Sequence, residues 1–200
     1  MRKLPGISFN QINKQIRNFS STVLREESTH CVKDRQNGLI NPGFLTGFTD
    51  GDGCFYLAIV KNKKLKTGWD IQLVFQIHLH TKDLFLLNQI KTYLGVGRID
   101  ILKSSVIFRV QAIKDLAKII EHFDKHPLMT QKLADYLLFK KVYSLVLNKK
   151  HLTTEGLQEI VSIKSAINLG LSEELKASFQ DSIIPVERPI IVDQKIADPY

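Results

Sequence analysis

The sequence has few of the features that mark membrane or disulfide-linked proteins. Across its 200 residues no apolar run approaches the roughly 18 residues that a membrane-spanning helix needs, so we expect no membrane segment. There are two cysteines, Cys31 and Cys54, and they form no spaced framework. This scarcity argues for a reducing compartment and against a zinc site or a disulfide scaffold.

Acidic residues are absent from the first 25 positions, which carry five basic residues and a serine-rich stretch at 18–25. This composition is typical of a mitochondrial targeting segment. A disordered arm, or sequence read through from an upstream exon, would have the same composition. We therefore predict that residues 1–40 form a disordered arm or a mitochondrial targeting segment. A targeting segment would imply a mitochondrial protein.

The C-terminal segment is also unlike the middle of the chain. Residues 181–200 hold three prolines and no helical repeat. Because the residue before a proline avoids the helical conformation, we predict an extended linker or tail there. The domain itself is expected at residues 41–180.

Basic residues outnumber acidic ones in that middle region. The net charge of the sequence is +8, and residues 41–180 contribute +6 of it, with nineteen Lys and Arg against thirteen Asp and Glu. A basic body of this kind is expected for a surface that binds phosphates. Many proteins, however, carry a basic surface that contacts only water.

The periodicity of apolar residues in 41–180 predicts an α+β domain. The expected helices cover 42–52, 81–94, 115–125, 130–149 and 153–168, and the expected strands cover 54–62, 69–80, 96–102 and 105–112. This is the order αββαββα, followed by extra helices. Because the strands follow one another as hairpins, we expect an antiparallel sheet with helices on one face.

The strand at 69–80 should present two unlike faces. Alternate side chains of a strand lie on opposite faces, and from Ile71 to Leu79 one set is wholly apolar, whereas the other is largely polar. The strand at 105–112 repeats this pattern and places Arg109 on the polar face. Gln suits adenine and Arg suits guanine in the major groove, which a two-stranded ribbon fits. A solvated outer sheet face has the same pattern, so both interpretations stay open.

The first predicted helix ends in an unusual stretch, residues 44–53. Gly47 and Gly51 lie four residues apart inside the helix, where each glycine costs about 1 kcal/mol relative to alanine, and this suggests that another backbone packs closely. Asp50 and Asp52 lie in the last turn, where the helix dipole repels a carboxylate unless a cation compensates. A strand follows at once. An oxygen-ligand Mg²⁺ site would account for these features, and a capping turn is the alternative.

The same stretch, Leu45-Thr-Gly-Phe-Thr-Asp-Gly-Asp-Gly53, resembles the LAGLIDADG motif of homing endonucleases. Four further segments resemble that family in its order, at residues 75–83, 93–97, 126–132 and 150–156. Together the five segments span roughly residues 41–180.

The resemblance implies a saddle-shaped sheet that lies on double-stranded DNA and a site-specific endonuclease that depends on Mg²⁺ or another divalent cation such as Mn²⁺. Asp52 would be the catalytic acid and a metal ligand, with the Gly51 carbonyl beside the same metal. Lys132 would be the second catalytic residue, near the scissile phosphate, and Asp50 would orient the helix end. The helix face expected to pack against a second domain consists of Leu45, Gly47, Phe48 and Gly51.

The resemblance also implies that the outer face of the sheet contacts DNA. The predicted DNA-binding residues are Tyr56, Ala58, Val60, Asn62, Asp70, Gln72, Gln76, His78, Ser105, Arg109 and Gln111.

The sequence has one such motif, whereas cutting both DNA strands requires two acids from two motif helices. We therefore expect a homodimer or a second LAGLIDADG domain. The five segments look most like the N-terminal half of a two-motif, single-chain member, so a truncated or split half is a further hypothesis. Because intron-borne members of the family also act as maturases, binding of intron RNA is an alternative function, and a half that only binds DNA is another.

Overall fold

The computed structural model describes residues 40–180, 183–184 and 186–192. The arm or targeting segment predicted at 1–40 therefore lies outside the described residues, apart from Ile40. Within the described part of the chain no helix is both long and apolar enough to cross a membrane.

Helix α2 (Pro42–Asp52) begins where the sequence predicts. The Asn41 side chain accepts hydrogen bonds from the N–H groups of Gly43 (2.8 Å) and Phe44 (3.4 Å), and Pro42 occupies the first helical position. The helix ends at Gly53, where a Cβ atom would lie 2.9 Å from the carbonyl oxygen of Thr49. Only glycine therefore lets strand β1 leave the helix so closely.

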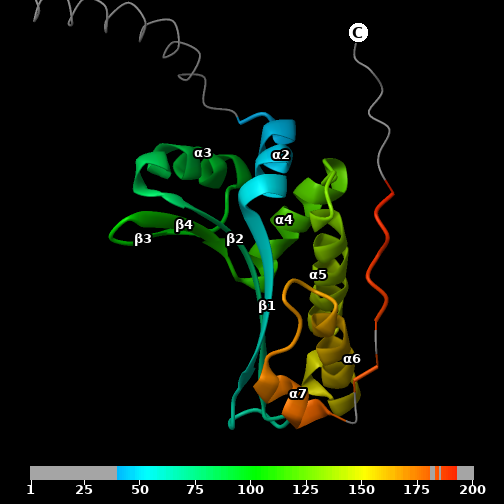
Figure 1. Cartoon of the computed structure of the whole chain (residues 1–200). Helices are drawn as coiled ribbons and strands as arrows, with labels where there is room; N and C mark the ends of the chain where they lie inside the picture. The colour runs from blue at the N-terminus through cyan, green and yellow to red at the C-terminus, as the bar shows by residue number, and fades with distance from the viewer. Residues whose placement is uncertain (1–39, 181–182, 185, 193–200) are drawn as a thin grey trace, which may run out of the picture. The chain divides into compact units, whose positions relative to one another are not determined.

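Four strands form one antiparallel sheet in the order β1-β2-β4-β3. They are β1 (Gly53–Lys61), β2 (Trp69–His80), β3 (Arg98–Ile101) and β4 (Ser105–Val110). Gly53 pairs with Ile77, and Gln76 pairs with Arg109. The predicted antiparallel sheet is confirmed, and Figure 1 shows the long β1–β2 hairpin beside the shorter β3–β4 hairpin. β3 starts two residues later than expected because Gly97 adopts a left-handed conformation, with φ of 89°.

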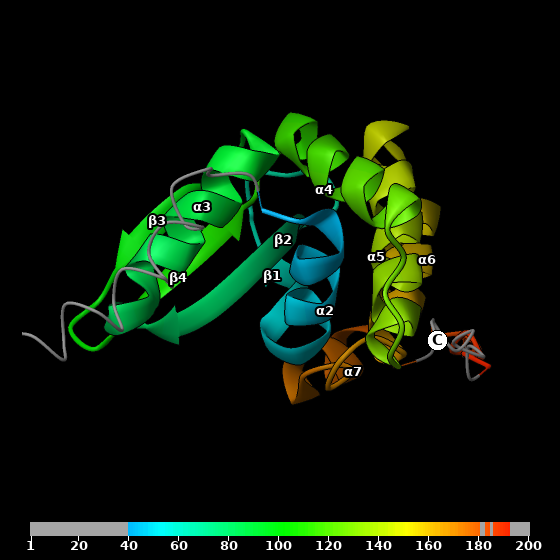
Figure 2. The same ribbon diagram turned by 90° about the horizontal axis from the view of Figure 1, so that it is seen from above.

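Helices cover the inner face of this sheet. They are α3 (Leu84–Leu94, after the short 3₁₀ helix η2, Thr81–Asp83), α4 (Ile113–Lys125), α5 (Lys132–Leu147) and α6 (Thr154–Ser165, after η3, Lys150–Leu152). α3, α4 and α5 pack against the strands, and α6 packs against α5 (Figure 2). A further helix, α7 (Glu173–Phe179), was not predicted from the sequence.

The core lies between the inner sheet face and these helices. Phe55 stands at its centre, with ring centroids of Phe75, Phe123, Tyr136 and Phe139 all between 5.2 and 5.4 Å away. Because Phe55 is 1% exposed and lies three residues after the end of α2, the core fixes the place where the helix meets the sheet.

Candidate functional site

The outer face of the sheet carries most of the side chains predicted to contact DNA. The register sets Ala58 opposite Gln72 and Gln76 opposite Arg109. A hollow of about 240 Å³ on this face is lined by Tyr56, Gln72, Val74, Gln76, Arg109 and Gln111. Strand pairing thus gathers amide, guanidinium and phenol groups from the β1–β2 hairpin and from the more distant β4.

Arg109 is held in place by neighbours that the sequence analysis missed. Arg98 lies directly opposite Arg109, and Asp100 joins the two cations, with its oxygens 3.1 Å from Arg98 Nε and 3.4 Å from Arg109 Nη1. Arg109 Nε is buried and has no hydrogen-bond partner in the part of the chain that the structure describes. The alternation of residues 98–101 could have placed Arg98 and Asp100 on this face.

The predicted residues Asn62 and Asp70 lie at the far end of the β1–β2 hairpin. The Asn62 side chain accepts a hydrogen bond from Lys64 N (3.1 Å), and Asp70 accepts one from Gln72 Nε2 (3.1 Å). Asn62 therefore shapes the turn that joins the two strands, while Asp70 orients a neighbouring amide on the outer face.

The other end of the sheet face meets the end of α2. Because Gly53 pairs with Ile77, the preceding residue Asp52 lies level with His78. The two share an open hollow of about 440 Å³, which is lined by Asp52, His78, Leu79, His80, Ser104 and Ser105. The exposed carboxylate of Asp52 thus opens onto the same face as the predicted DNA-binding residues.

Asp50 holds the segment before α5 against the end of α2. Its carboxylate accepts hydrogen bonds from Met129 N (2.9 Å), Thr130 N (3.3 Å) and Thr130 Oγ1 (2.7 Å). The segment leads directly to Lys132, so Asp50 positions the start of α5.

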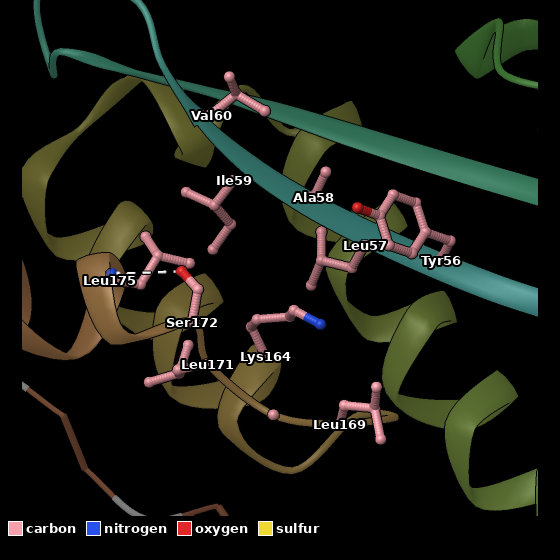
Figure 3. A pocket seen from close by; sticks show the side chains of 11 residues that line it. Tyr56, Leu57, Ala58, Ile59, Val60, Lys164, Leu169, Leu171, Ser172 and Leu175 are labelled. Carbon is pink, nitrogen blue, oxygen red and sulfur yellow. Dashed lines mark hydrogen bonds between the residues drawn. The ribbon is translucent and has the colours of Figure 1, made fainter.

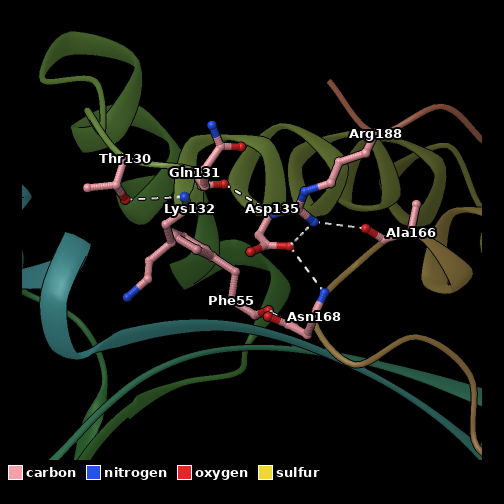
Figure 4. A network of polar contacts seen from close by, with 8 residues as sticks. All are labelled: Phe55, Thr130, Gln131, Lys132, Asp135, Ala166, Asn168 and Arg188. Atoms are coloured by element: carbon pink, nitrogen blue, oxygen red, sulfur yellow. Dashed lines mark hydrogen bonds and ion pairs between the residues drawn. The ribbon is translucent and has the colours of Figure 1, made fainter. Parts of the chain in front are cut away.

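Lys132 supplies the cation that the acids at the end of α2 require. Its ammonium donates to the carbonyl oxygens of Thr49 (2.8 Å), Gly51 (3.1 Å) and Gly53 (2.7 Å). These carbonyls lie at the C-terminus of α2, where helices leave acceptors unpaired and where a positive charge is favourable. Figure 4 shows Lys132 reaching from α5 toward the start of β1. All three ammonium protons are used, so Lys132 acts here on the helix end.

One face of α2 is open. Gly47 and Gly51 are exposed, and apart from the adjoining backbone of α2 itself, no atom of the described residues lies within 4 Å of the place that a Cβ would take at either residue. Phe44 and Phe48 stack beside them with ring centroids 5.6 Å apart. Leu45, also predicted on this face, is instead 0% exposed and belongs to the core. The physical reason is that two helical residues turn the chain by about 200°, so Leu45 lies opposite Gly47.

The donors at this end fit a hard divalent cation in part. A carboxylate and a backbone carbonyl, from Asp52 and Gly51, are the oxygen ligands that Mg²⁺ prefers. The described residues contain no group of three or more His, Cys, Asp or Glu side chains able to hold a metal ion. Asp52 and the Gly51 carbonyl would therefore supply only part of the ligand set of a divalent cation.

The described domain is thus a basic α+β fold whose outer sheet face carries many polar side chains and has the exposed Asp52 at one end. Comparison with known proteins is more specific. Residues 45–143 match the family model described as LAGLIDADG endonuclease. The chain is 47% identical over 165 residues to a probable intron-encoded endonuclease 3 of Neurospora crassa. The aligned region covers 80% of this chain and 31% of that protein.

Two further relatives agree. A probable intron-encoded endonuclease, Cox1-I1b, of Schizosaccharomyces pombe is 35% identical over 76% of this chain and 41% of its own length. The LAGLIDADG homing endonuclease I-SmaMI, solved on an uncleaved DNA target in the presence of calcium ions, superposes with a TM-score of 0.76 at 45% identity, over 80% of this chain and 55% of that one. This chain therefore belongs to the LAGLIDADG endonuclease family. It spans less than half the length of these two curated relatives.

Proposed function

We propose that this chain is one half of a site-specific DNA endonuclease, which binds double-stranded DNA on the outer face of its sheet and hydrolyses phosphodiester bonds with a divalent cation. One observation carries the proposal. The exposed carboxylate of Asp52 shares a hollow with His78 and Ser105, which belong to the polar sheet face. An acid in this place would meet the backbone of any duplex that the sheet face reads.

Recognition would follow from the side chains gathered on that face. The guanidinium of Arg109 and the amides of Gln72, Gln76 and Gln111 line the same hollow. Guanidinium and amide groups match guanine and adenine in the major groove. Asp100 fixes the guanidinium before DNA arrives, so little side-chain freedom would be lost on binding.

For catalysis, Asp52 and the Gly51 carbonyl would hold Mg²⁺ or a cation such as Mn²⁺. When bound, the cation acidifies water and neutralises charge on the phosphate. The ammonium of Lys132 offsets the negative end of the α2 dipole, beside which the Asp52 carboxylate lies. Asp50 keeps Lys132 at this distance through the segment at 129–130.

A second acid is needed to cut the second strand. We propose that it comes from a second copy of this chain, or from a second domain like it, packed along Gly47 and Gly51. The open space at both glycines supports this arrangement, because another helix backbone could approach there closely. The names of the relatives also support an intron-encoded origin and, through Cox1, a mitochondrial location.

The experiment that tests the proposal uses Asp52→Asn. The wild-type chain is incubated with a randomised duplex library and Mg²⁺, and cleaved ends are sequenced to define the target. We expect Asp52→Asn to lose cleavage by at least about 1,000-fold, a loss typical of removing one strong charge-stabilising group. Its affinity for the target should stay within a few-fold of the wild type, because no phosphate contact is removed.

Asp115→Asn, at the first turn of α4, is the matched control and should cut normally. If Asp52→Asn cuts as well as the wild type, or if it loses binding and cutting together, the proposed role of Asp52 is wrong.

A further inference from the structure

A third hollow lies beside the sheet, at the free edge of β1. It has a volume of about 320 Å³ and separates residues 56–60 of β1 from the loop between α6 and α7 (Figure 3). Three of the predicted DNA-binding residues, Tyr56, Ala58 and Val60, border this hollow from the sheet. The other residues that line it were not predicted as site residues. The hollow is therefore continuous with the outer face of the sheet, yet it has walls of its own.

Lys164, at the end of α6, provides the only charge among the residues that line this hollow. The residue is 9% exposed overall, and Figure 3 shows its nitrogen directed into the space between β1 and the loop. Within the described residues, this ammonium has no hydrogen-bond acceptor and no carboxylate within ion-pair distance, and its nitrogen is not among the buried polar atoms. An unpaired ammonium that opens into a hollow is suited to binding an anion.

The carboxylate of Asp135, whose charge acts on Lys164, already accepts other hydrogen bonds. Asp135 accepts hydrogen bonds from Arg188 Nη1 (2.7 Å) and from Asn168 N (3.1 Å), as Figure 4 shows. Burial lowers the pKa of Lys164, and the charges of Cys54 and then Asp135 act in the opposite sense. Asp135 makes no ion pair with Lys164, so the ammonium is open to another anion.

The loop that forms the outer wall is rigidly built. Asn168 and Gly170 have positive φ angles of 50° and 76°, and the Asn168 side chain donates to the carbonyl of Phe55 (2.7 Å) on the free edge of β1. This clamp displays Leu169 entirely to solvent, at 101% exposure. The loop therefore holds an apolar tip, Leu169, beside the hollow into which the Lys164 ammonium opens.

We infer that this hollow binds a backbone phosphate of duplex DNA, with Lys164 as the ligand of the phosphate and Leu169 packed against the adjoining sugar. The inference rests on the proposed function, since the duplex that covers Tyr56 and Val60 would bring its backbone past the edge of β1. The contact reads no base. It anchors the DNA beside the sheet in a register that the outer face then reads.

The test measures affinity for a mixed-sequence duplex by fluorescence anisotropy over a range of salt concentrations. A phosphate anchor acts on any sequence, so the cleavage target is not required. Lys164→Met should weaken binding roughly 3- to 10-fold at moderate salt and make the slope of log affinity against log salt shallower by about one. Lys118→Met, an exposed lysine on α4, removes the same charge and should leave the slope almost unchanged.

Leu169→Glu keeps the test informative if Lys164→Met fails to fold. A fully exposed tip tolerates the substitution, and the added carboxylate should repel the phosphate and weaken binding at least as much. Leu147→Glu, at the far end of α5, is its matched control. If Lys164→Met and Leu169→Glu both bind with wild-type affinity and slope, the phosphate site is wrong although the proposed function stands. If the wild type binds no duplex at all, both are wrong.

Discussion

Helix α2 has one face that packs in the core and one face that is exposed. The closed face consists of Leu45, Thr46 and Thr49, with exposures of 0%, 6% and 0%. The open face carries Gly47 and Gly51, with open space where a side chain would begin. The two faces belong to the same eleven residues, so the difference comes from their positions around the helix axis.

This contrast separates folding from function within one element. The closed face is tied to the rest of the domain, since Thr46 Oγ1 donates to the carbonyl of His126 (3.0 Å) and also contacts His122 Nε2 (3.4 Å). The open face contributes nothing comparable and carries two residues that weaken a helix. A sequence that keeps such a face has a use for it beyond the stability of the single domain.

The largest expected effect on stability comes from a substitution on the closed face of α2. Leu45→Ala should lower the free energy of unfolding by about 3 kcal/mol, because it removes a fully buried side chain and leaves a cavity. Phe44→Ala on the open face removes a larger side chain that is 48% exposed and should cost much less. Denaturant unfolding of the two variants measures the comparison directly. Equal losses would show that the two faces are not distinct in the isolated domain.

The next effect concerns the cation at the end of α2. Lys132→Met should lower the free energy of unfolding by about 2 kcal/mol, because three carbonyls lose a charged donor. Lys141→Met, which removes only an exposed ion pair with Glu159, is the control and should change stability by less than about 1 kcal/mol. Thermal unfolding of both variants provides the measurement. A Lys132 variant as stable as its control would contradict the capping role.

A third effect depends on pH and acts through the closed face. Burial, and next the charge of His126, lower the pKa of His122 to about 4 from an ordinary value of 6.5. Between pH 6.5 and pH 4 the His122 ring is protonated in the unfolded chain but neutral in the folded protein. Protons therefore favour the unfolded chain in this range, so the free energy of unfolding is highest above pH 6.5 and declines toward pH 4. We expect a decline of roughly 1–2 kcal/mol, less than the full shift implies, because His122 borders an open hollow.

His122→Gln should remove this part of the pH dependence, as measured by denaturant unfolding at several pH values between 4 and 7. An unchanged slope in the variant would mean that other groups, such as the carboxylates, account for acid sensitivity.

The smallest effect has the opposite sign. Gly47→Ala should raise the stability of the isolated domain by about 0.5–1 kcal/mol, because alanine favours the helix and its methyl group meets no atom. The same change should weaken association through this face. Calorimetry at low protein concentration isolates the first effect, and a destabilised variant would show that Gly47 already has a close neighbour within the domain.

Much of the fold follows from local sequence signals. Alternation predicted strand 69–80 at its correct bounds, and Asn41-Pro42 predicted the start of α2. The short helix α7 was missed because seven residues are too few for a helical repeat to stand out. Its cap was visible nevertheless, since Ser172 is followed by two glutamates and accepts a hydrogen bond from Leu175 N.

The site was harder to predict because it depends on contacts between distant segments. The motif itself pointed to Asp52, but helical geometry was needed to see that Leu45 faces away from Gly47. The need for a cation was foreseen from the helix dipole, whereas the three carbonyl contacts of Lys132 became visible only with α5 in place. Lys164 was missed because only the packing of α6 brings it beside β1, whereas alternation could have placed Arg98 on the outer face and only its position opposite Arg109 required the register of β3.

The claim that the open face of α2 receives a second LAGLIDADG helix is tested most directly by the solution mass of the full chain, measured by light scattering beside Gly47→Gln. The account predicts twice the chain mass of 22.8 kDa for the wild type and a single chain mass for the folded variant. A wild-type chain that stays single at every concentration, and that the substitution leaves unchanged, would contradict the pairing of two copies through this face.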